Sequence, residues 1–174
     1  MFLLSEQLVQ RYMDRKLIQI IDFEEDNLYP TCYYFQLGRV AEVPGPEGFQ
    51  TVNVEREGYI LIPSHSVARV ESREHFTLSD NTLALLGNTT GFLREKQLQL
   101  LHGPTIDPGW KQRLGLAIYN MGNSPTRVEY GERIGKAMFF DISDSALEEA
   151  RLTPEARRRA RELERGEGET SAPH

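Results

Sequence analysis

Short apolar runs separated by turn residues dominate the sequence from Cys32 to about Met138. The breaks between the runs are rich in glycine, proline, asparagine and aspartate, as in residues 44–48, 107–109 and 121–125. Short runs at spacings of roughly 8 to 15 residues are typical of β-strands joined by tight turns. Because no helical pattern of about 10 to 15 residues lies between them, a parallel α/β sheet is disfavoured. The pattern predicts a mainly-β fold, a distorted roll or barrel.

The runs expected to form strands cover residues 32–37, 51–54, 59–62, 68–71, 83–86, 98–101, 114–119, 126–128 and 134–140. An N-terminal helix is indicated by a suitable N-cap and by apolar residues at helical spacing, namely Ser5, Leu8, Val9, Tyr12 and Met13. After Ile142 the chain becomes rich in alanine, leucine, glutamate and arginine. We expect one domain over residues 1–142, a helical C-terminal extension over 143–165 and a disordered tail over 166–174.

Composition excludes several classes of protein. The 174 residues suffice for one ordinary domain, and no run approaches the roughly 18 to 20 consecutive apolar residues of a membrane helix. The single cysteine, Cys32, excludes an internal disulfide framework and a cysteine-rich zinc site, and the four histidines lack metal-ligand spacing. The net charge of −6 makes nucleic acid an unexpected partner. With no signal-peptide pattern at the start, a cytoplasmic protein is the expectation.

Residues 83–140 contain the most specific motifs. The pentad at 87–91, Gly-Asn-Thr-Thr-Gly, offers two hydroxyls, an amide and backbone N–H groups, which can cradle phosphate oxygens. An ordinary polar hairpin loop explains the same letters. Asp107 stands in a turn beside Trp110, where a carboxylate can activate water and an aromatic ring can form a wall for a sugar or base. The alternative is a type I turn that Asp107 opens and Pro108 follows.

The order and spacing of these pieces resemble the dCTP deaminase and dUTPase superfamily over about residues 2–142. The matching segments are Leu4-Ser5-Glu6-Gln7-Leu8, Gln36-Leu37-Gly38, Ile106-Asp107-Pro108-Gly109-Trp110, Leu116, Tyr119-Asn120 and Gly131-Glu132-Arg133-Ile134-Gly135. The resemblance implies a small distorted β-roll that assembles as a homotrimer, with nucleotide sites between subunits. It also implies a pyrimidine deoxynucleotide as ligand.

Two positions depart from the deaminase pattern. The deaminases place a glutamate two residues after Gly115, where it shuttles protons during attack of water on the cytosine ring, and this chain has Ala117 there. General acid–base help is worth roughly 10² to 10⁴ in rate, and the family works without zinc, so deamination is expected to be nearly abolished. The family phosphate turn reads Gly-Arg-Ser-Ser, whereas Gly87 is followed here by Asn88, Thr89 and Thr90. Asparagine cannot supply the bidentate charged contacts of arginine.

The dUTPases fit some positions better. They lack a glutamate at position 117, and the aspartate that corresponds to Asp107 activates water against the α-phosphorus, with Mg²⁺ carried on the triphosphate. An aromatic residue that corresponds to Trp110 packs against the deoxyribose. Their phosphate turn also requires an arginine, and their first motif requires an aspartate that residues 32–35 lack. The usual C-terminal lids of both branches are replaced by the segment rich in alanine and arginine over 146–165.

Two functions from different classes follow. The first is an enzyme that hydrolyses a pyrimidine deoxynucleoside triphosphate with Mg²⁺, in which Asp107 is the base. The residues expected at the nucleotide are Asn88, Thr89, Thr90, Arg94, His102, Ile106 and Trp110. The second is a catalytically silent homologue that senses nucleotides or binds a protein through its C-terminal helix. The arginines at 157–159 are interpreted as one face of a solvated helix.

Overall fold

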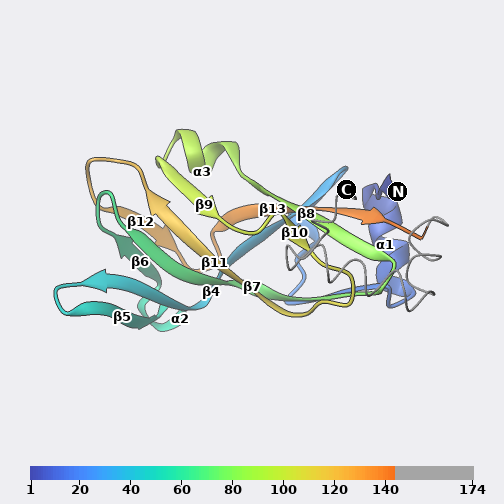
Figure 1. The fold of residues 1–174 in the computed structure, drawn as a ribbon, viewed down its shortest axis with the longest axis horizontal. Helices are drawn as coiled ribbons and strands as arrows, with labels where there is room; N and C mark the ends of the chain where they lie inside the picture. Colours follow the sequence, from blue (N-terminus) through green and yellow to red (C-terminus); the bar gives the residue numbers. More distant parts are fainter. Residues whose placement is uncertain (144–174) are drawn as a thin grey trace, which may run out of the picture.

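The computed structural model describes residues 1–143, which fold around one curled antiparallel sheet (Figure 1). The central strands follow the order β10 (Thr105–Ile106), β8 (Thr82–Asn88), β13 (Arg133–Asp141), β4 (Cys32–Gly45), β7 (Val67–Leu78), β11 (Lys111–Asn120) and β9 (Leu98–Leu101). The helical extension and the tail expected after Ser143 lie outside the described residues.

Shorter strands pair with this sheet or with each other. β1 (Phe2–Leu3) pairs with β13, β2 (Ile18–Ile21) with β7, and both β3 (Leu28–Tyr29) and β5 (Gly48–Asn53) with β4. β6 (Tyr59–Ile62) and β12 (Thr126–Glu129) form a separate two-stranded sheet. The helices are α1 (Glu6–Asp14), α2 (Val54–Glu57) and α3 (Thr90–Arg94), with a 3₁₀ turn over Glu25–Asn27. Within the described residues, no helix has the length and apolar character needed to cross a membrane.

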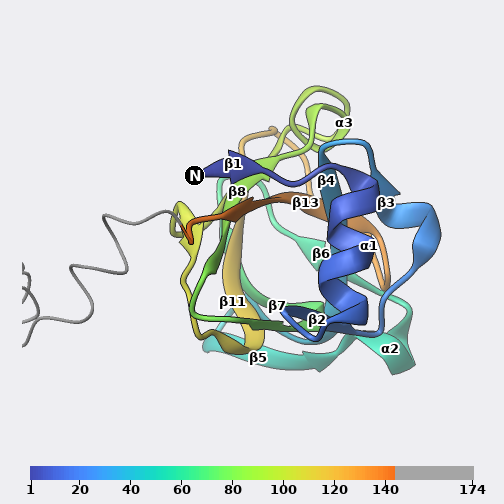
Figure 2. The same ribbon diagram turned by 90° about the vertical axis from the view of Figure 1, so that its right-hand side faces the viewer.

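The core fills the inside of the curled sheet, because alternate residues of each long strand face inward. Four aromatic side chains that are almost wholly buried form its centre: Tyr33, Phe35, Phe76 and Phe139. Helix α1 lies across one end of the curled sheet, and α2 lies at the other with the β4–β5 hairpin and the two-stranded sheet of β6 and β12 (Figures 1 and 2). The mainly-β roll expected from the sequence is confirmed.

The expected strands lie where the sequence placed them, with two differences. Eight of the nine runs fall wholly inside strands, whereas Val54 begins α2 rather than ending a strand. Strands β4 and β7 run on well past the expected ends at residues 37 and 71. In β7 the reason is that Ser72 and Glu74 occupy inward positions, so the apolar alternation breaks although the strand continues. Ser5 is the N-cap residue of α1 as expected, although its hydroxyl makes no capping hydrogen bond.

Glycine is required where β13 crosses the core. A Cβ atom added at Gly135 would overlap the ring of Phe35 and lie 2.7 Å from Leu100 Cδ2. Gly135 therefore allows β13 to pair with β4 over the large ring of Phe35. Gly131 serves a different purpose, because its φ of +73° allows the turn that leads into β13.

Candidate functional site

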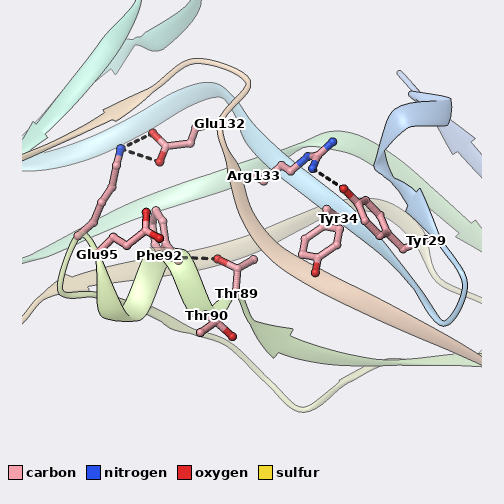
Figure 3. A pocket seen from close by; sticks show the side chains of 10 residues that line it. Tyr29, Tyr34, Thr89, Thr90, Phe92, Glu95, Glu132 and Arg133 are labelled. Atoms are coloured by element: carbon pink, nitrogen blue, oxygen red, sulfur yellow. Dashed lines mark hydrogen bonds and ion pairs between the residues drawn. The ribbon is translucent and has the colours of Figure 1, made fainter.

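A pocket of about 500 Å³ lies between α3 and the start of β13. Its lining residues are Tyr29, Tyr34, Thr89, Thr90, Gly91, Phe92, Glu95, Lys96, Glu132 and Arg133. Figure 3 shows Thr89 and Thr90 at the start of α3 on one side, and Tyr29, Tyr34 and Arg133 on the other. Two of the residues expected at a nucleotide, Thr89 and Thr90, thus line the same cavity.

The start of α3 holds Thr89 in place. Its hydroxyl accepts a hydrogen bond from the backbone N–H of Phe92 at 3.3 Å, and Phe92 is buried in the core. Thr89 is therefore the N-cap of a short helix, and Thr90 is exposed beside it. The pentad at 87–91 is not simply a turn, because Gly87 and Asn88 are the last residues of β8.

Asn88 has a structural role. Its Oδ1 accepts a hydrogen bond from the backbone N–H of Leu100 at 2.7 Å, which joins the end of β8 to the edge strand β9. An edge strand has no sheet partner for such a group, and a buried N–H without a partner is costly. Asn88, which stands where the family pattern has an arginine, therefore links β8 to β9 by a hydrogen bond.

The charges that line the pocket compensate one another. Lys96 Nζ lies 2.6 Å from a carboxylate oxygen of Glu132 and also donates to the carbonyl of Arg127 at 3.0 Å. Glu95 contributes a second acid, so the two cations and two acids of the lining sum to zero. A triphosphate carries several negative charges, and this pocket offers it little net attraction.

The Arg133 side chain is held by hydrogen bonds within its own chain. Its guanidinium donates to Asn27 Oδ1 at 2.6 Å, to the hydroxyl of Tyr29 at 3.1 Å and to the carbonyl of Asp26 at 2.8 Å. It also lies 5.6 Å from the ring centroid of Tyr34. Burial raises the pKa of Tyr34, so its hydroxyl stays protonated. Arg133 thus fixes the segment before β3 and the wall of the pocket.

Arg94, at the end of α3, has an exposed side chain. Within residues 1–143, no hydrogen bond or ion pair joins its guanidinium to another group. Arg94 is not among the lining residues of the pocket, but it keeps its charge free for an anion that reaches α3 from outside.

Asp107 is exposed and oriented. The hydroxyl of Thr105 donates to Asp107 Oδ1 at 2.7 Å, and over residues 1–143 no hydrogen bond engages Oδ2. Trp110 is half-buried against the core, and its Nε1–H donates to the carbonyl of Gln112 at 2.8 Å. Ile106 is fully buried, so it presents no surface to a ligand in this chain. His102 is half-buried and contacts the neighbouring Gly103 carbonyl through Nδ1.

The phosphate-binding candidates and Asp107 lie apart within one chain. β10 pairs with β8 so that Ile106 lies opposite Ala84, and Asp107 continues away from the end of β8. Thr89 lies five residues beyond Ala84 in the other direction, which at 3.3 Å per strand residue is about 17 Å. A single chain therefore cannot place Thr89 and Asp107 on the same phosphate group.

Ala117 lies on the outer face of β11. It pairs with Leu101 of β9 on one side and with Arg69 of β7 on the other. These three positions face the same side of the sheet, away from the core, because their neighbours Leu116 and Ile118 are buried. The position where deaminases have their glutamate is therefore accessible at the surface, and Ala117 supplies no titratable group there.

Asn120, another residue of the matching motifs, is structural. Its fully buried side chain donates to the carbonyls of Ile62 and Ser124 and accepts from the N–H of Gly122 at 2.9 Å. It thus joins the end of β6 and the loop before β12 to the end of β11.

Sequence reasoning missed the other walls of the pocket. Tyr34 was predictable as outward-facing, because it lies between the buried Tyr33 and Phe35 of one strand. The pairing of Lys96 with Glu132 joins residues far apart in sequence and left no local signal.

The comparisons with known proteins identify the family of the chain. A family model described as dCTP deaminase-like matches residues 3–142. A dCTP deaminase of Pyrococcus horikoshii is 33% identical over 130 residues, which cover 75% of this chain and 80% of the relative. The chain belongs to the dCTP deaminase-like family.

Solved structures give the same fold. A 2′-deoxycytidine 5′-triphosphate deaminase from Agrobacterium tumefaciens superposes with a TM-score of 0.65 at 17% identity, over 79% of this chain and 47% of that protein. The chain thus spans about half the length of the Agrobacterium protein. A mutant dUTPase from phage phi11 of S. aureus, which coordinates a structural Mg(II) ion, gives 0.51 at 12% identity, over 74% of this chain and 92% of that protein.

The described part of this dCTP deaminase-like chain offers no ready-made magnesium site. Over residues 1–143, no three His, Cys, Asp or Glu side chains are arranged to hold a metal ion.

Proposed function

We propose that this dCTP deaminase-like protein hydrolyses a pyrimidine deoxynucleoside triphosphate to the monophosphate and pyrophosphate. The observation that carries the proposal is the contrast between Asp107, exposed and oriented by Thr105, and Ala117, which leaves the deaminase position without a carboxylate. The base would lie over the face of β11 that carries Ala117, and the phosphates beside α3.

In this reaction Asp107 Oδ2 accepts a proton from a water molecule as the water oxygen bonds to the α-phosphorus. The bond between the α-phosphorus and the oxygen bridging to the β-phosphorus breaks, and pyrophosphate leaves with that oxygen. Thr105 holds the carboxylate of Asp107 through the other oxygen. Mg²⁺ bound to the triphosphate would offset its negative charge.

The phosphates would meet Thr89, Thr90 and Arg94, whose polar groups are at the surface around α3. Because Thr89 and Asp107 are more than about 17 Å apart along the direction of β8, the complete site needs a second copy of the chain. We therefore propose a homotrimer with sites between subunits, as the family resemblance implies. Sedimentation equilibrium of the purified protein should give the mass of three chains.

A silent homologue is the second candidate, and the charge balance of the α3 pocket favours it. Lys96 and Arg133 are both engaged by their own chain, and Asn88 is used between strands. A protein of this kind would bind a nucleotide weakly or bind another protein, without turnover.

Pyrophosphate release from dCTP and dUTP with Mg²⁺ separates the two functions. Hydrolysis is expected in the wild type and should be lost in Asp107→Asn, because the amide cannot accept the proton from water. The matched control is Asp14→Asn, an exposed aspartate at the end of α1. No pyrophosphate release despite measurable nucleotide binding would support the silent homologue, and release that Asp107→Asn preserves would contradict the role of Asp107.

A further inference from the structure

The outer face of β7 and β11 holds a carboxylate without a partner. Glu71 of β7 is half-buried on the same side of the sheet as Ala117. Over residues 1–143, no hydrogen bond or ion pair joins the Glu71 side chain to another group. A half-buried charge with no partner is unusual for a purely structural residue and is available to a ligand.

The register places Glu71 within reach of position 117. Glu71 pairs directly with Gly115, and Ala117 pairs with Arg69, so Glu71 and Ala117 are diagonal neighbours. Diagonal neighbours in an antiparallel pair are about 7–8 Å apart at Cα, a gap that a long side chain spans. No atom lies within 4 Å of the place where a Cβ of Gly115 would be, so the space between them is open.

Arg69, one of the cations on this face, is engaged elsewhere. Arg69 NH1 lies 3.1 Å from a carboxylate oxygen of Glu42, and its guanidinium lies 4.4 Å from the ring centroid of Phe49. Arg69 and Glu71 both line a groove of about 200 Å³ between β4 and β7. Because Glu42 neutralises Arg69, the charge of Glu71 is left available to a ligand at this face.

The rest of the face is suited to a flat ring. Leu101 pairs with Ala117 on its other side and is 40% exposed. A methyl group and an isobutyl group thus lie beside the open backbone of Gly115, with one carboxylate at the edge. Such a surface fits an aromatic ring that carries a hydrogen-bond donor toward Glu71.

We propose that Glu71 contacts the base of the bound nucleotide and selects cytosine over uracil. The inference rests on the proposed function, which puts the base over Ala117. A carboxylate only accepts hydrogen bonds, and the exocyclic amino group of cytosine donates them. Uracil carries a carbonyl oxygen in place of this amino group. The carbonyl oxygen and the Glu71 carboxylate are both hydrogen-bond acceptors, so neither would find a donor in the other.

Titration calorimetry with the α,β-imido analogues of dCTP and dUTP in Mg²⁺ tests the assignment. The full-length wild type should bind the dCTP analogue at least about tenfold more tightly, as expected for a hydrogen bond to a charged group. In Glu71→Gln the preference should fall to about parity, because the amide can also donate to the uracil oxygen. Glu71→Asp keeps the charge but shortens the reach, and an intermediate preference is expected.

The matched control is Glu47→Gln, which removes a charge from the exposed turn between β4 and β5 and should keep the wild-type preference. Equal binding of both analogues by the wild type, or an unchanged preference in Glu71→Gln, would overturn the role of Glu71 while the proposed function stands. Binding of neither analogue would overturn the nucleotide function and this role with it. Gel filtration and thermal unfolding of each variant show whether its fold is retained.

Discussion

Glu74 is a fully buried acid in the core, and its ionisation should set the pH dependence of stability. Its carboxylate accepts hydrogen bonds from the hydroxyl of Tyr33 at 3.3 Å and from the backbone N–H of Gln36 at 3.0 Å. These bonds favour the charged form, but desolvation outweighs them and raises the pKa of Glu74 from 4.5 to about 7. At neutral pH the folded state therefore holds this proton more tightly than the unfolded state does.

The direction in which stability changes with pH follows from that difference in proton affinity. Below pH 4.5 Glu74 is protonated in both states, and its contribution is fully present. As the pH rises from 4.5 to 7 the unfolded chain ionises first, so the folded state loses relative stability until both are ionised. A shift of about 2.5 pKa units corresponds to about 3 kcal/mol, most of which falls between pH 5 and pH 8.

Glu74→Gln removes the titration and keeps the size of the side chain. The variant should be about as stable as the wild type at pH 5, because protonated Glu74 and an amide each offer one carbonyl oxygen to the two hydrogen-bond donors. Between pH 5 and pH 8 the difference in free energy of unfolding between the two proteins should shift in favour of the variant by about 2–3 kcal/mol. Urea unfolding at several pH values measures this, and the shared titration of all other groups cancels in the difference. Parallel profiles for the two proteins would refute the reasoning.

Two further substitutions test the packing at Gly135 and the structural role of Asn88. Gly135→Ala should destabilise the fold by about 1–3 kcal/mol in urea unfolding, because its methyl group would overlap the ring of Phe35, whereas Gly115→Ala has open space and should change little. Asn88→Ala should cost about 1–3 kcal/mol because it leaves the N–H of Leu100 without a partner, and it should leave nucleotide affinity unchanged. A loss of affinity at full stability would instead make Asn88 a phosphate ligand.

The positions of the strands could be predicted because alternation and turn residues are local signals. The prediction stopped early in β7, where Ser72 and Glu74 face the core and the polar letters resemble a turn. Only the tertiary fold shows that Ser72 donates to the carbonyl of Glu74 and that the Glu74 side chain has partners. Local sequence patterns cannot show whether buried polar groups will have hydrogen-bond partners.

The site was predictable in its motifs but not in its pairings. Thr89 and Thr90 line a pocket, yet Asn88 of the same pentad belongs to the sheet. The relation of Glu71 to Ala117 depends on the register of β7 against β11, which is set by a bulge that the sequence does not reveal. The separation of Thr89 from Asp107 likewise follows from strand pairing.

The central claim is that Ala117 ends deamination while Asp107 keeps the triphosphate chemistry. Chromatography of the nucleotides after incubation of the purified protein with dCTP and Mg²⁺ tests both halves at once. The expected products are dCMP and pyrophosphate, with no uracil nucleotide and no ammonia. Formation of a uracil nucleotide with release of ammonia would contradict the reasoning at Ala117, and an unchanged dCTP pool would contradict the hydrolysis.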